Sequence, residues 1–533
     1  MVRIVLRKLS STIMGGAIII GSASILSRIV GLARDNLLAK YFGASATLDV
    51  YNAAFKVPDL LFNILVLGAL SASFIPVFIE RREKSGEADA FKTVNALLNF
   101  LLVAVLICIA ISYIFAPAFA NFLMAERSVD QQVTTALLMR VMLVSLIFFA
   151  VSNVISGVLN SYRRFLAYAI APILYNVGII IGITVFFPRV GIIGLAYGVV
   201  LGAFMHMLIQ IPALLRTGFR YRFIWDISLP GVRKILKLMP PRALALGIVQ
   251  INALIIAAFA LRLEEGSLAV WTWADNLQHF PINVFGVSLA LSSFPVFSQA
   301  FAEKDMAKFK NVFSENFRRI MFFIIPISIG FLLLRAQAVR LILGSFGGGQ
   351  FDWNATILTA QILGLFSISM FAQASIPLLA RSFFAHHDTK TPVYISIFVM
   401  IINVLLAWSL SSYFGIYGLA AAFSFSSLLS MLLLLTVLRL KFGDLDDKRI
   451  IKSVWQIVSA ALIMGLVVHG LKYFIAPLVD MKTFVGIFTQ TSVSIVGGAL
   501  VYIGLAFLLK FDEVAIIREY ISKIKQAIKK SQQ

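Results

Sequence analysis

The chain has 533 residues, of which 60% are hydrophobic and only 13% are charged, and its formal net charge at pH 7 is +21. A soluble domain carries roughly a quarter charged residues, so the composition excludes an ordinary soluble protein and predicts an all-α polytopic membrane protein. The positive charges fall in the loops between apolar runs, which indicates membrane topology and excludes nucleic acid as the partner.

About 14 apolar runs are long enough to cross a bilayer, since a spanning helix needs about 20 apolar residues. The run at the N-terminus continues past Arg28, so we expect it to be the first span and not a cleaved signal peptide. The expected spans are 12–40, 49–79, 93–121, 133–158, 166–187, 191–215, 240–262, 268–301, 312–335, 355–384, 392–412, 416–438, 452–474 and 485–509.

Two short motifs recur along the chain. SASFIPVF at 71–78 returns as LSSFPVF at 291–297, and GIIGLAY at 191–197 returns as GIYGLAA at 415–421, both offset by about 220 residues. This repeat predicts two six-helix lobes followed by two extra C-terminal helices, and repeated lobes are typical of transporters. The expected parts are an N-terminal lobe at 1–215, a basic linker at 216–239, a C-terminal lobe at 240–440, helices 13 and 14 at 441–511, and a basic amphipathic tail at 512–533.

Lysine and arginine concentrate in alternate loops, so the positive-inside rule places those loops and both termini in the cytoplasm. The basic tail is expected to contact anionic lipids of the inner leaflet. The single cysteine, Cys108, cannot form an intramolecular disulfide. The sequence contains no histidine, cysteine and aspartate set with metal spacing and no phosphate-binding glycine loop, so we expect no metal and no cofactor.

The first span contains SRIVGLARD at 27–35, with three charges where a lipid-facing helix should carry none. A charge at the bilayer centre costs at least about 2.5 kcal/mol, so it is kept where it faces a bundle interior or a wet cavity. Arg28 and Asp35 are expected to share a helix face about 10 Å apart along the axis, with Gly31 between them, while Arg34 points elsewhere.

The second and eighth spans add polar groups. Five polar residues in the second span are spaced 3, 4, 3 and 4, which makes one stripe on a helix. They are Asp49, Asn52, Lys56, Asp59 and Asn63. The eighth span contributes Asp275 and Asn276 within WTWADNLQHFP. With Arg28, Arg34 and Asp35, these residues are the candidate substrate-binding cavity; the alternative is that the charges pair and only hold the bundle together.

The segment SRIVGLARDNLLAKYFGASATLDVYNAAFKVPDLL resembles the N-terminal signature of the MurJ/MviN family of lipid II flippases. Three further stretches resemble the family: LNSYRRFLAYAIAPILYN at 159–176, FPINVFGVSLALSSFPVFSQAFA at 280–302 and FFAHHDTKTPV at 383–393. The resemblance implies the fold of the multidrug/oligosaccharidyl-lipid/polysaccharide exporter superfamily, with a cavity between two lobes that opens to alternate sides. It also implies that the last two helices form a groove for an undecaprenyl tail, and that the substrate is lipid II.

The sequence departs from the family pattern at four positions. The family usually carries an arginine pair where this chain has Phe62 and Asn63, a glutamate in place of Leu67, and an arginine in place of Asn276. The expected cavity is therefore of mixed charge and not plainly cationic. Some members bind sodium through carboxylates on spans seven and eleven, where this chain offers Asn252 and Asn403.

The leading hypothesis is a flippase in the bacterial cytoplasmic membrane that moves lipid II from the inner to the outer leaflet without covalent chemistry. One alternative is a flippase for another polyprenyl-linked glycan, or a cation-coupled exporter of small molecules, which the aspartates favour. A second is a non-transporting scaffold that holds other cell-wall synthesis proteins together. A glycosyltransferase or ligase would need larger outer loops than 122–132 and 339–354 provide, so we expect no enzyme.

Overall fold

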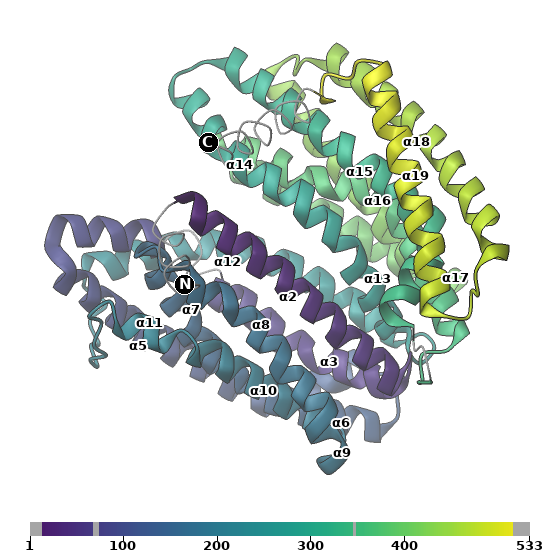
Figure 1. Ribbon diagram of the computed structural model, residues 1–533. Helices are drawn as coiled ribbons and strands as arrows, with labels where there is room; N and C mark the ends of the chain where they lie inside the picture. The colour runs from purple at the N-terminus through teal and green to yellow at the C-terminus, as the bar shows by residue number, and fades with distance from the viewer. Residues whose placement is uncertain (1–12, 68–73, 345–347, 515–533) are drawn as a thin grey trace, which may run out of the picture. The chain divides into compact units, whose positions relative to one another are not determined.

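The computed structural model describes residues 13–67, 74–344 and 348–514, and within these ranges all regular secondary structure is helical (Figure 1). The described chain forms two compact units. The first contains Met1–Ala269 and Gly348–Phe351, and the second contains Val270–Gly347 and Asp352–Gln533. The predicted all-α class is confirmed.

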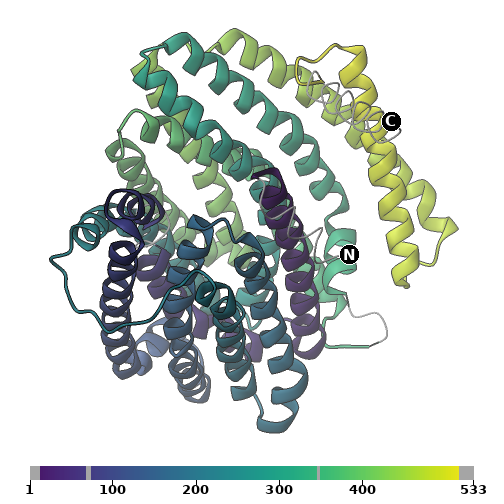
Figure 2. The ribbon, with the colours of Figure 1, turned by 60° about the vertical axis from the view of Figure 1, so that its left-hand side comes forward.

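The first unit is a helical bundle in which both sequential and non-sequential helices pack together. Helix α2 packs against α8, α8 packs against α10, and α5 packs against α6 and α7 (Figures 1 and 2). Its elements are α2 (Ile13–Phe42), α3 (Ala46–Leu61), η1 (Phe62–Leu67), α5 (Phe74–Leu123), α6 (Val129–Leu143), α7 (Ser145–Ser161), α8 (Phe165–Ile181), η2 (Gly182–Phe186), α9 (Phe187–Val190), α10 (Ile193–Leu208), α11 (Ile211–Leu215) and α12 (Pro230–Leu261).

The second unit is built around a phenylalanine-rich core that includes Phe309, Phe313 and Phe383. Helix α15 packs against α16 and α18, and α18 packs against α19. Its elements are α13 (Ser267–Pro281, whose first three residues belong to the first unit), η3 (Ile282–Val287), α14 (Ser288–Ala302), α15 (Met306–Leu343), α16 (Trp353–Ala385), α17 (Lys390–Phe442), α18 (Asp447–Ile475), η4 (Ala476–Leu478) and α19 (Phe484–Leu508).

Eleven helices of the described residues are long and apolar enough to cross a membrane, which makes this a multi-pass membrane protein. One of them, α17, covers two predicted spans, because Gly415 interrupts it with φ 55° and ψ −135°. The arrangement of twelve spans plus two stays a prediction. Helix α12 packs on α3, η1 and α5 of the first unit, whereas the sequence suggested that the second lobe begins at residue 240.

The repeat is also visible in the backbone. The first unit contains a π-helix at Phe62–Leu67 and the second contains one at Ile282–Val287, an offset of 220 residues. Each follows an apolar helix that contains a proline, Pro58 in α3 and Pro281 in α13. A π-helical turn holds one residue more than an α-helical turn, so the same local distortion occurs at the same place in both units.

Helices α8 and α10 approach each other through glycines. A Cβ atom on Gly178 would lie 2.3 Å from Gly202 Cα, and one on Gly198 would lie 2.5 Å from Gly182 Cα. Small residues spaced four apart let helix backbones meet closely in membranes, where packing replaces the hydrophobic effect as the source of association. These glycines therefore fix the distance between two spans of the first unit.

The chain after α19 is joined to α15 and α18 by one buried and one exposed ion pair. Arg318 of α15 is 3% exposed and pairs with Glu513, which also accepts a hydrogen bond of 3.0 Å from the Ser453 hydroxyl of α18. Arg449 of α18 donates to Asp512 at 2.8 Å. The chain beyond α19 is thus bound back onto α15 and α18. The predicted amphipathic tail lies outside the described residues from 515 onward.

Candidate functional site

The ten candidate cavity residues are divided between the two units. Eight belong to the first unit and two, Asp275 and Asn276, belong to the second. We describe each set within its own unit.

Arg34 is the centre of a polar cluster between α2 and α8. Its Nε and Nη2 atoms donate to Asp35 Oδ1 at 3.0 and 2.8 Å, and Nη1 donates to Asn176 Oδ1 at 3.0 Å. Asn176 in turn donates to the Pro172 carbonyl at 3.0 Å. A Cβ on Gly31 would lie at ordinary contact distance, 3.8 Å, from Asn176 Oδ1, so Gly31 faces Asn176 but the approach of α8 does not require a glycine there. The Arg34 side chain as a whole keeps 23% of its surface exposed.

Arg28 lies apart from this cluster. It is exposed, and within the part of the chain that the structure describes it makes no hydrogen bond or ion pair. The sequence placed Asp35 on the face of Arg28, but the carboxylate pairs with the adjacent Arg34 instead. This is possible because the long arginine side chain can fold back along the helix surface, which Cα spacing alone does not describe. The Arg28 guanidinium is thus open to an external anion.

Asp49 is completely buried and binds the start of α13. Its Oδ2 accepts from the Gly266 amide at 2.8 Å and its Oδ1 from the Ala269 amide at 2.9 Å. Arg127 lies 3.5 Å from Oδ2 and donates to the carbonyls of Leu261 and Leu263, both at 2.8 Å. A carboxylate on helix N-terminal amides and a cation on C-terminal carbonyls both complement the helix dipoles. Asp49 therefore holds the connection between α12 and α13.

The rest of the second-span stripe becomes more open along α3. Asn52 and Lys56 are half-buried and Asp59 is exposed. The Lys56 ammonium lies close enough to Asp59 for charge attraction, as their spacing of three residues predicts. Asn63, in η1, donates to the Asp59 carbonyl at 2.8 Å.

The second unit has its own polar group around Asp275. Gln278 donates to Asp275 Oδ1 at 2.9 Å, and His279 Nδ1 lies 3.2 Å from the same oxygen. Gln373 of α16 extends the group by donating to Gln278 Oε1 at 2.9 Å and to the Ser369 hydroxyl at 3.0 Å. Asn276, half-buried, is the next residue of α13.

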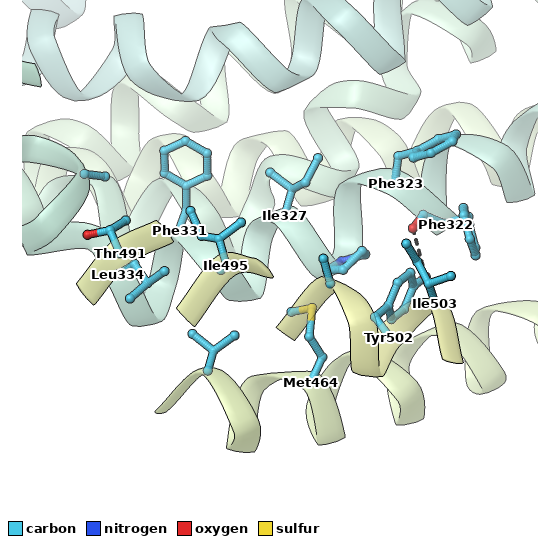
Figure 3. Close-up of a pocket in the computed structure, with 15 residues that line it drawn as sticks. Phe322, Phe323, Ile327, Phe331, Leu334, Met464, Thr491, Ile495, Tyr502 and Ile503 are labelled. Atoms are coloured by element: carbon cyan, nitrogen blue, oxygen red, sulfur yellow. Dashed lines mark hydrogen bonds between the residues drawn. The ribbon is translucent and has the colours of Figure 1, made fainter. Parts of the chain in front are cut away.

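An apolar groove of about 340 Å³ lies among α15, α18 and α19 (Figure 3). Phe331 and Ile327 face it from α15, Ile495 from α19 and Met464 from α18. Nothing lies within 4 Å of the Cβ position of Gly330, so that side of the groove is open. Tyr502 donates its hydroxyl to the Phe322 carbonyl at 2.9 Å, which satisfies the polar group and leaves a hydrocarbon surface.

The sequence model of the family described as lipid II flippase MurJ matches residues 38–489. The chain belongs to the MurJ family. The lipid II flippase MurJ of Burkholderia cenocepacia is 29% identical over 455 residues, which cover 84% of this chain and 87% of that protein. A solved structure of lipid II flippase MurJ in an inward closed conformation covers 95% of this chain and 100% of its own, with 25% identity and a TM-score of 0.76.

The MurJ fold is shared more widely. A multidrug resistance MATE family transporter of the MOP superfamily, in an inward-facing conformation, matches 81% of this chain and 99% of its own with a TM-score of 0.66 and 16% identity. That identity establishes likeness of fold alone. The expected superfamily fold is therefore confirmed.

Sequence reasoning missed the partners of the MurJ candidates. Asn176 lies 142 residues from Arg34, Arg127 lies 78 residues from Asp49, and Gln373 lies 95 residues from its partner Gln278, which in turn bonds Asp275. None of the three was singled out in the sequence, although Asn176 is the last residue of the family-like stretch at 159–176. An asparagine inside an apolar span was the available signal for Asn176, since a buried amide needs partners. Arg127 was counted only as a loop charge.

Proposed function

We propose that this protein moves lipid II, the lipid-linked precursor of peptidoglycan, from the inner to the outer leaflet of the bacterial cytoplasmic membrane by alternating access. The family match over residues 38–489 carries the proposal. Two features support it: guanidinium groups in an apolar helix, and a hydrocarbon groove in the second unit. Lipid II presents a pyrophosphate head and a polyprenyl tail, which these features suit.

The arginines of α2 are proposed to receive the pyrophosphate. A guanidinium can bind two phosphate oxygens at once and keeps its charge in an apolar setting. Arg28 is exposed and open to an anion, whereas Arg34 is oriented by Asp35 and Asn176. We propose that Arg28 makes the first contact with the headgroup and that Arg34 provides a second, fixed donor set.

The groove of α15, α18 and α19 is proposed to hold the polyprenyl chain while the headgroup crosses. Its lining offers no charged side chain, so a hydrocarbon tail would lose nothing by leaving the lipid phase. No bond is made or broken, so the protein is proposed to act as a transporter and not as an enzyme. Both termini are proposed to be cytoplasmic, with anionic lipids contacting the basic tail.

The test is lipid II flipping by the purified full chain in proteoliposomes. A charge-assisted hydrogen bond is worth about 1.5–3 kcal/mol, so we expect Arg28→Ala and Arg34→Ala each to slow flipping by tenfold or more. The matched control is Arg189→Ala, because Arg189 is exposed in the same unit and donates only to the Val185 carbonyl of its own turn. Unchanged flipping in both α2 variants would exclude the proposed headgroup site.

A second test addresses the tail groove. Gly330→Phe should fill the groove and slow flipping, whereas Gly504→Phe should not, because nothing lies near the Cβ position of either glycine but only Gly330 lines the groove. Binding of both variants to free undecaprenyl pyrophosphate, measured by native mass spectrometry, should separate in the same way. Equal behaviour of the two variants would contradict the assignment of this groove to the polyprenyl chain.

The acidic residues favour one other candidate, a cation-coupled exporter of small molecules, because Asp59 is exposed in the first unit. A flippase for a different polyprenyl-linked glycan would use the same groove. A scaffold for cell-wall synthesis proteins would flip nothing. Offering lipid II, another polyprenyl-linked glycan and a cationic dye to the same vesicles distinguishes all of them, since each alternative predicts a different transported compound or none.

A further inference from the structure

The segment that joins α11 to α12 in the first unit carries aromatic and basic side chains on its surface. Residues 219–226 have no regular secondary structure, and the segment lies at the edge of the unit in both views (Figures 1 and 2). Four of its large apolar side chains are between 43% and 73% exposed: Tyr221, Phe223, Trp225 and Ile227. Two arginines of the same stretch are also exposed, Arg220 and Arg222. The proposed headgroup site and tail groove use none of these residues.

Two buried asparagines of α5 hold the backbone of this segment. Asn95 and Asn99 are 2% and 3% exposed and lie about one helical turn apart. Asn95 donates to the Arg220 carbonyl at 3.2 Å and accepts from the Arg222 amide at 3.1 Å. Asn99 donates to the Ile224 carbonyl at 3.0 Å. The peptide groups of an irregular segment must find partners wherever water is scarce, and here two side-chain amides of a neighbouring helix supply them.

Side chains of the segment pack on the same helix. Phe219 is 5% exposed and belongs to the hydrophobic core of the first unit. Tyr221 donates its hydroxyl to Asn99 Oδ1 at 2.8 Å, and the rings of Trp225 and Phe100 have centroids 6.3 Å apart. The segment is therefore seated on α5 along its length, and its exposed side chains project from a fixed backbone.

The place of the segment along α5 indicates its depth in the membrane. Lys92 is the last charged residue before the uncharged run 93–125. Asn95 and Asn99 lie about 4 and 10 Å beyond Lys92 along the helix, at 1.5 Å per residue. The headgroup region of a bilayer is about 5–8 Å thick on each side. The segment bonded to the two asparagines is therefore level with the headgroups and the first acyl carbons, where tryptophan and tyrosine concentrate.

The charges of the segment suit the phosphate groups at this depth. The linker 216–239 contains six basic residues and one acidic residue, Asp226, which accepts from the Ser228 amide at 2.8 Å. Within the described chain, the guanidinium groups of Arg220 and Arg222 form no ion pair. A guanidinium can bind two phosphate oxygens at once, and both groups are exposed where phospholipid would present them.

We propose that residues 219–227 anchor the first unit in the headgroup layer of the membrane, with phospholipid as the partner. Arg220 and Arg222 bind lipid phosphates, and Phe223 and Trp225 insert beside the first methylene groups of the acyl chains. The two asparagines of α5 are positioning residues, since they hold the backbone of the segment at this depth. The proposal goes beyond the proposed function and holds whatever compound the protein transports.

The test measures the depth of one side chain in the full chain. In a variant with Cys108 replaced by serine, Phe223→Cys carries a nitroxide, and the protein is placed in nanodiscs of phosphatidylcholine and phosphatidylglycerol. Electron paramagnetic resonance compares collisions of the label with oxygen, which concentrates in lipid, and with a nickel chelate, which stays in water. The control label is at Glu83→Cys, an exposed position. We expect oxygen to dominate at residue 223 and the chelate to dominate at residue 83.

Substitutions then test the contacts that fix this depth. Arg220→Gln together with Arg222→Gln should lower the oxygen-to-chelate ratio at residue 223 by about fivefold, because each basic residue beside an anionic membrane surface contributes a factor of about that size. Lys448→Gln together with Lys452→Gln removes two exposed charges from α18 and should leave the ratio unchanged. Asn99→Leu should also lower the ratio, because the segment loses a donor that holds its backbone.

A label at residue 223 that the chelate reaches as readily as it reaches residue 83 would place the segment in water and overturn the anchor. A label that neither oxygen nor the chelate reaches would reveal a protein contact instead, and an unchanged ratio in the double arginine variant would reject phosphate as the ligand. Thermal unfolding midpoints of the variants, compared with the wild type, exclude loss of fold as the cause. Lipid II plays no part in this measurement, so its result is independent of the flipping assay.

Discussion

Asp49 binds two segments of the first unit through one carboxylate that has no exposed surface. It accepts two backbone amides at the start of α13 and lies beside Arg127, which binds the end of α12. A buried acceptor of this kind is expensive to remove, because its partners are left without hydrogen bonds in a dry environment.

We therefore expect Asp49→Ala to lower stability by about 3 kcal/mol and Asp49→Asn to lower it less, since the amide keeps one oxygen acceptor. Thermal unfolding in detergent, followed by tryptophan fluorescence, measures the difference. Asp130→Ala is the control, because Asp130 is an exposed aspartate of the same unit. Equal midpoints for Asp49→Ala and Asp130→Ala would show that the buried contacts contribute nothing.

The charged residues of α2 show what a single sequence could and could not reveal. The sequence predicted a role for Arg34 and Asp35, because insertion of a charge into an apolar span is costly. It could not reveal that Arg34 reaches Asn176, since that contact depends on how α2 and α8 pack. The three-and-four spacing of the second-span stripe was read from sequence, but the complete burial of Asp49 at its beginning was not.

At the scale of helices, the glycine contacts between α8 and α10 predict that adding one methyl group to an interface glycine destabilises the protein. Gly198→Ala would place Cβ 2.5 Å from Gly182 Cα, which is backbone and cannot rotate away. We expect a loss of about 1–3 kcal/mol, as for overpacked cores, seen as a lower unfolding midpoint. Gly21→Ala, at a helical glycine with nothing within 4 Å of its Cβ position, should be neutral. Parallel behaviour of the two variants would exclude the close contact.

Asp388 lies in the turn before α17, and we expect its contribution to stability not to change with pH near neutrality. Asp388 accepts from the Thr391 amide at 3.0 Å and from Lys441 Nζ at 2.6 Å, which ties the start of α17 to its end. Partial burial raises the pKa of Asp388, but the bonds from Lys441 and Thr391 outweigh it and lower the pKa to about 2.

A depressed carboxyl pKa contributes stability above the unfolded pKa of about 3.9 and loses it as the pH falls through about 2. The difference in unfolding midpoint between wild type and Asp388→Asn should therefore be constant from about pH 8 to about pH 5. The corresponding loss in free energy of unfolding should be below about 1 kcal/mol, because Lys441 is 38% exposed and the pair is screened. A difference that vanished by pH 5 would contradict the assignment.

At the scale of the whole molecule, the distribution of lysine and arginine predicts the orientation in the membrane. In a variant with Cys108 replaced by serine, Glu83→Cys should react with an impermeant maleimide only after the cells are permeabilised. Glu126→Cys should react in intact cells. Both glutamates are exposed; Glu83 lies just before the break in α5 at Gly86, and Glu126 lies just beyond the end of α5 at Leu123. Reversed labelling would invert the topology and the proposed direction of transport.

The helical class and the repeat followed from composition and period, which are local properties of the chain. The predicted spans 392–412 and 416–438 fall on α17 on either side of Gly415, where φ is 55°. The association of α12 with α3 and α5 was not predictable, because it depends on surfaces far apart in sequence. The buried pair of Arg318 and Glu513 was missed for the same reason, since each residue alone resembles an ordinary loop or tail charge.

The π-helices at Phe62–Leu67 and Ile282–Val287 bear on how the two halves of the chain evolved. A π-helical turn differs from an α-helical turn by one additional residue, so each marks a place where the helix accommodates an insertion. The same insertion stands at Phe62–Leu67 and again at Ile282–Val287, 220 residues later. Two independent insertions at one site are a poorer explanation than a single inherited one. One ancestral half-molecule that already carried the extra residue explains both π-helices, whereas the third, at Gly182–Phe186, has no counterpart 220 residues later, where α17 is α-helical.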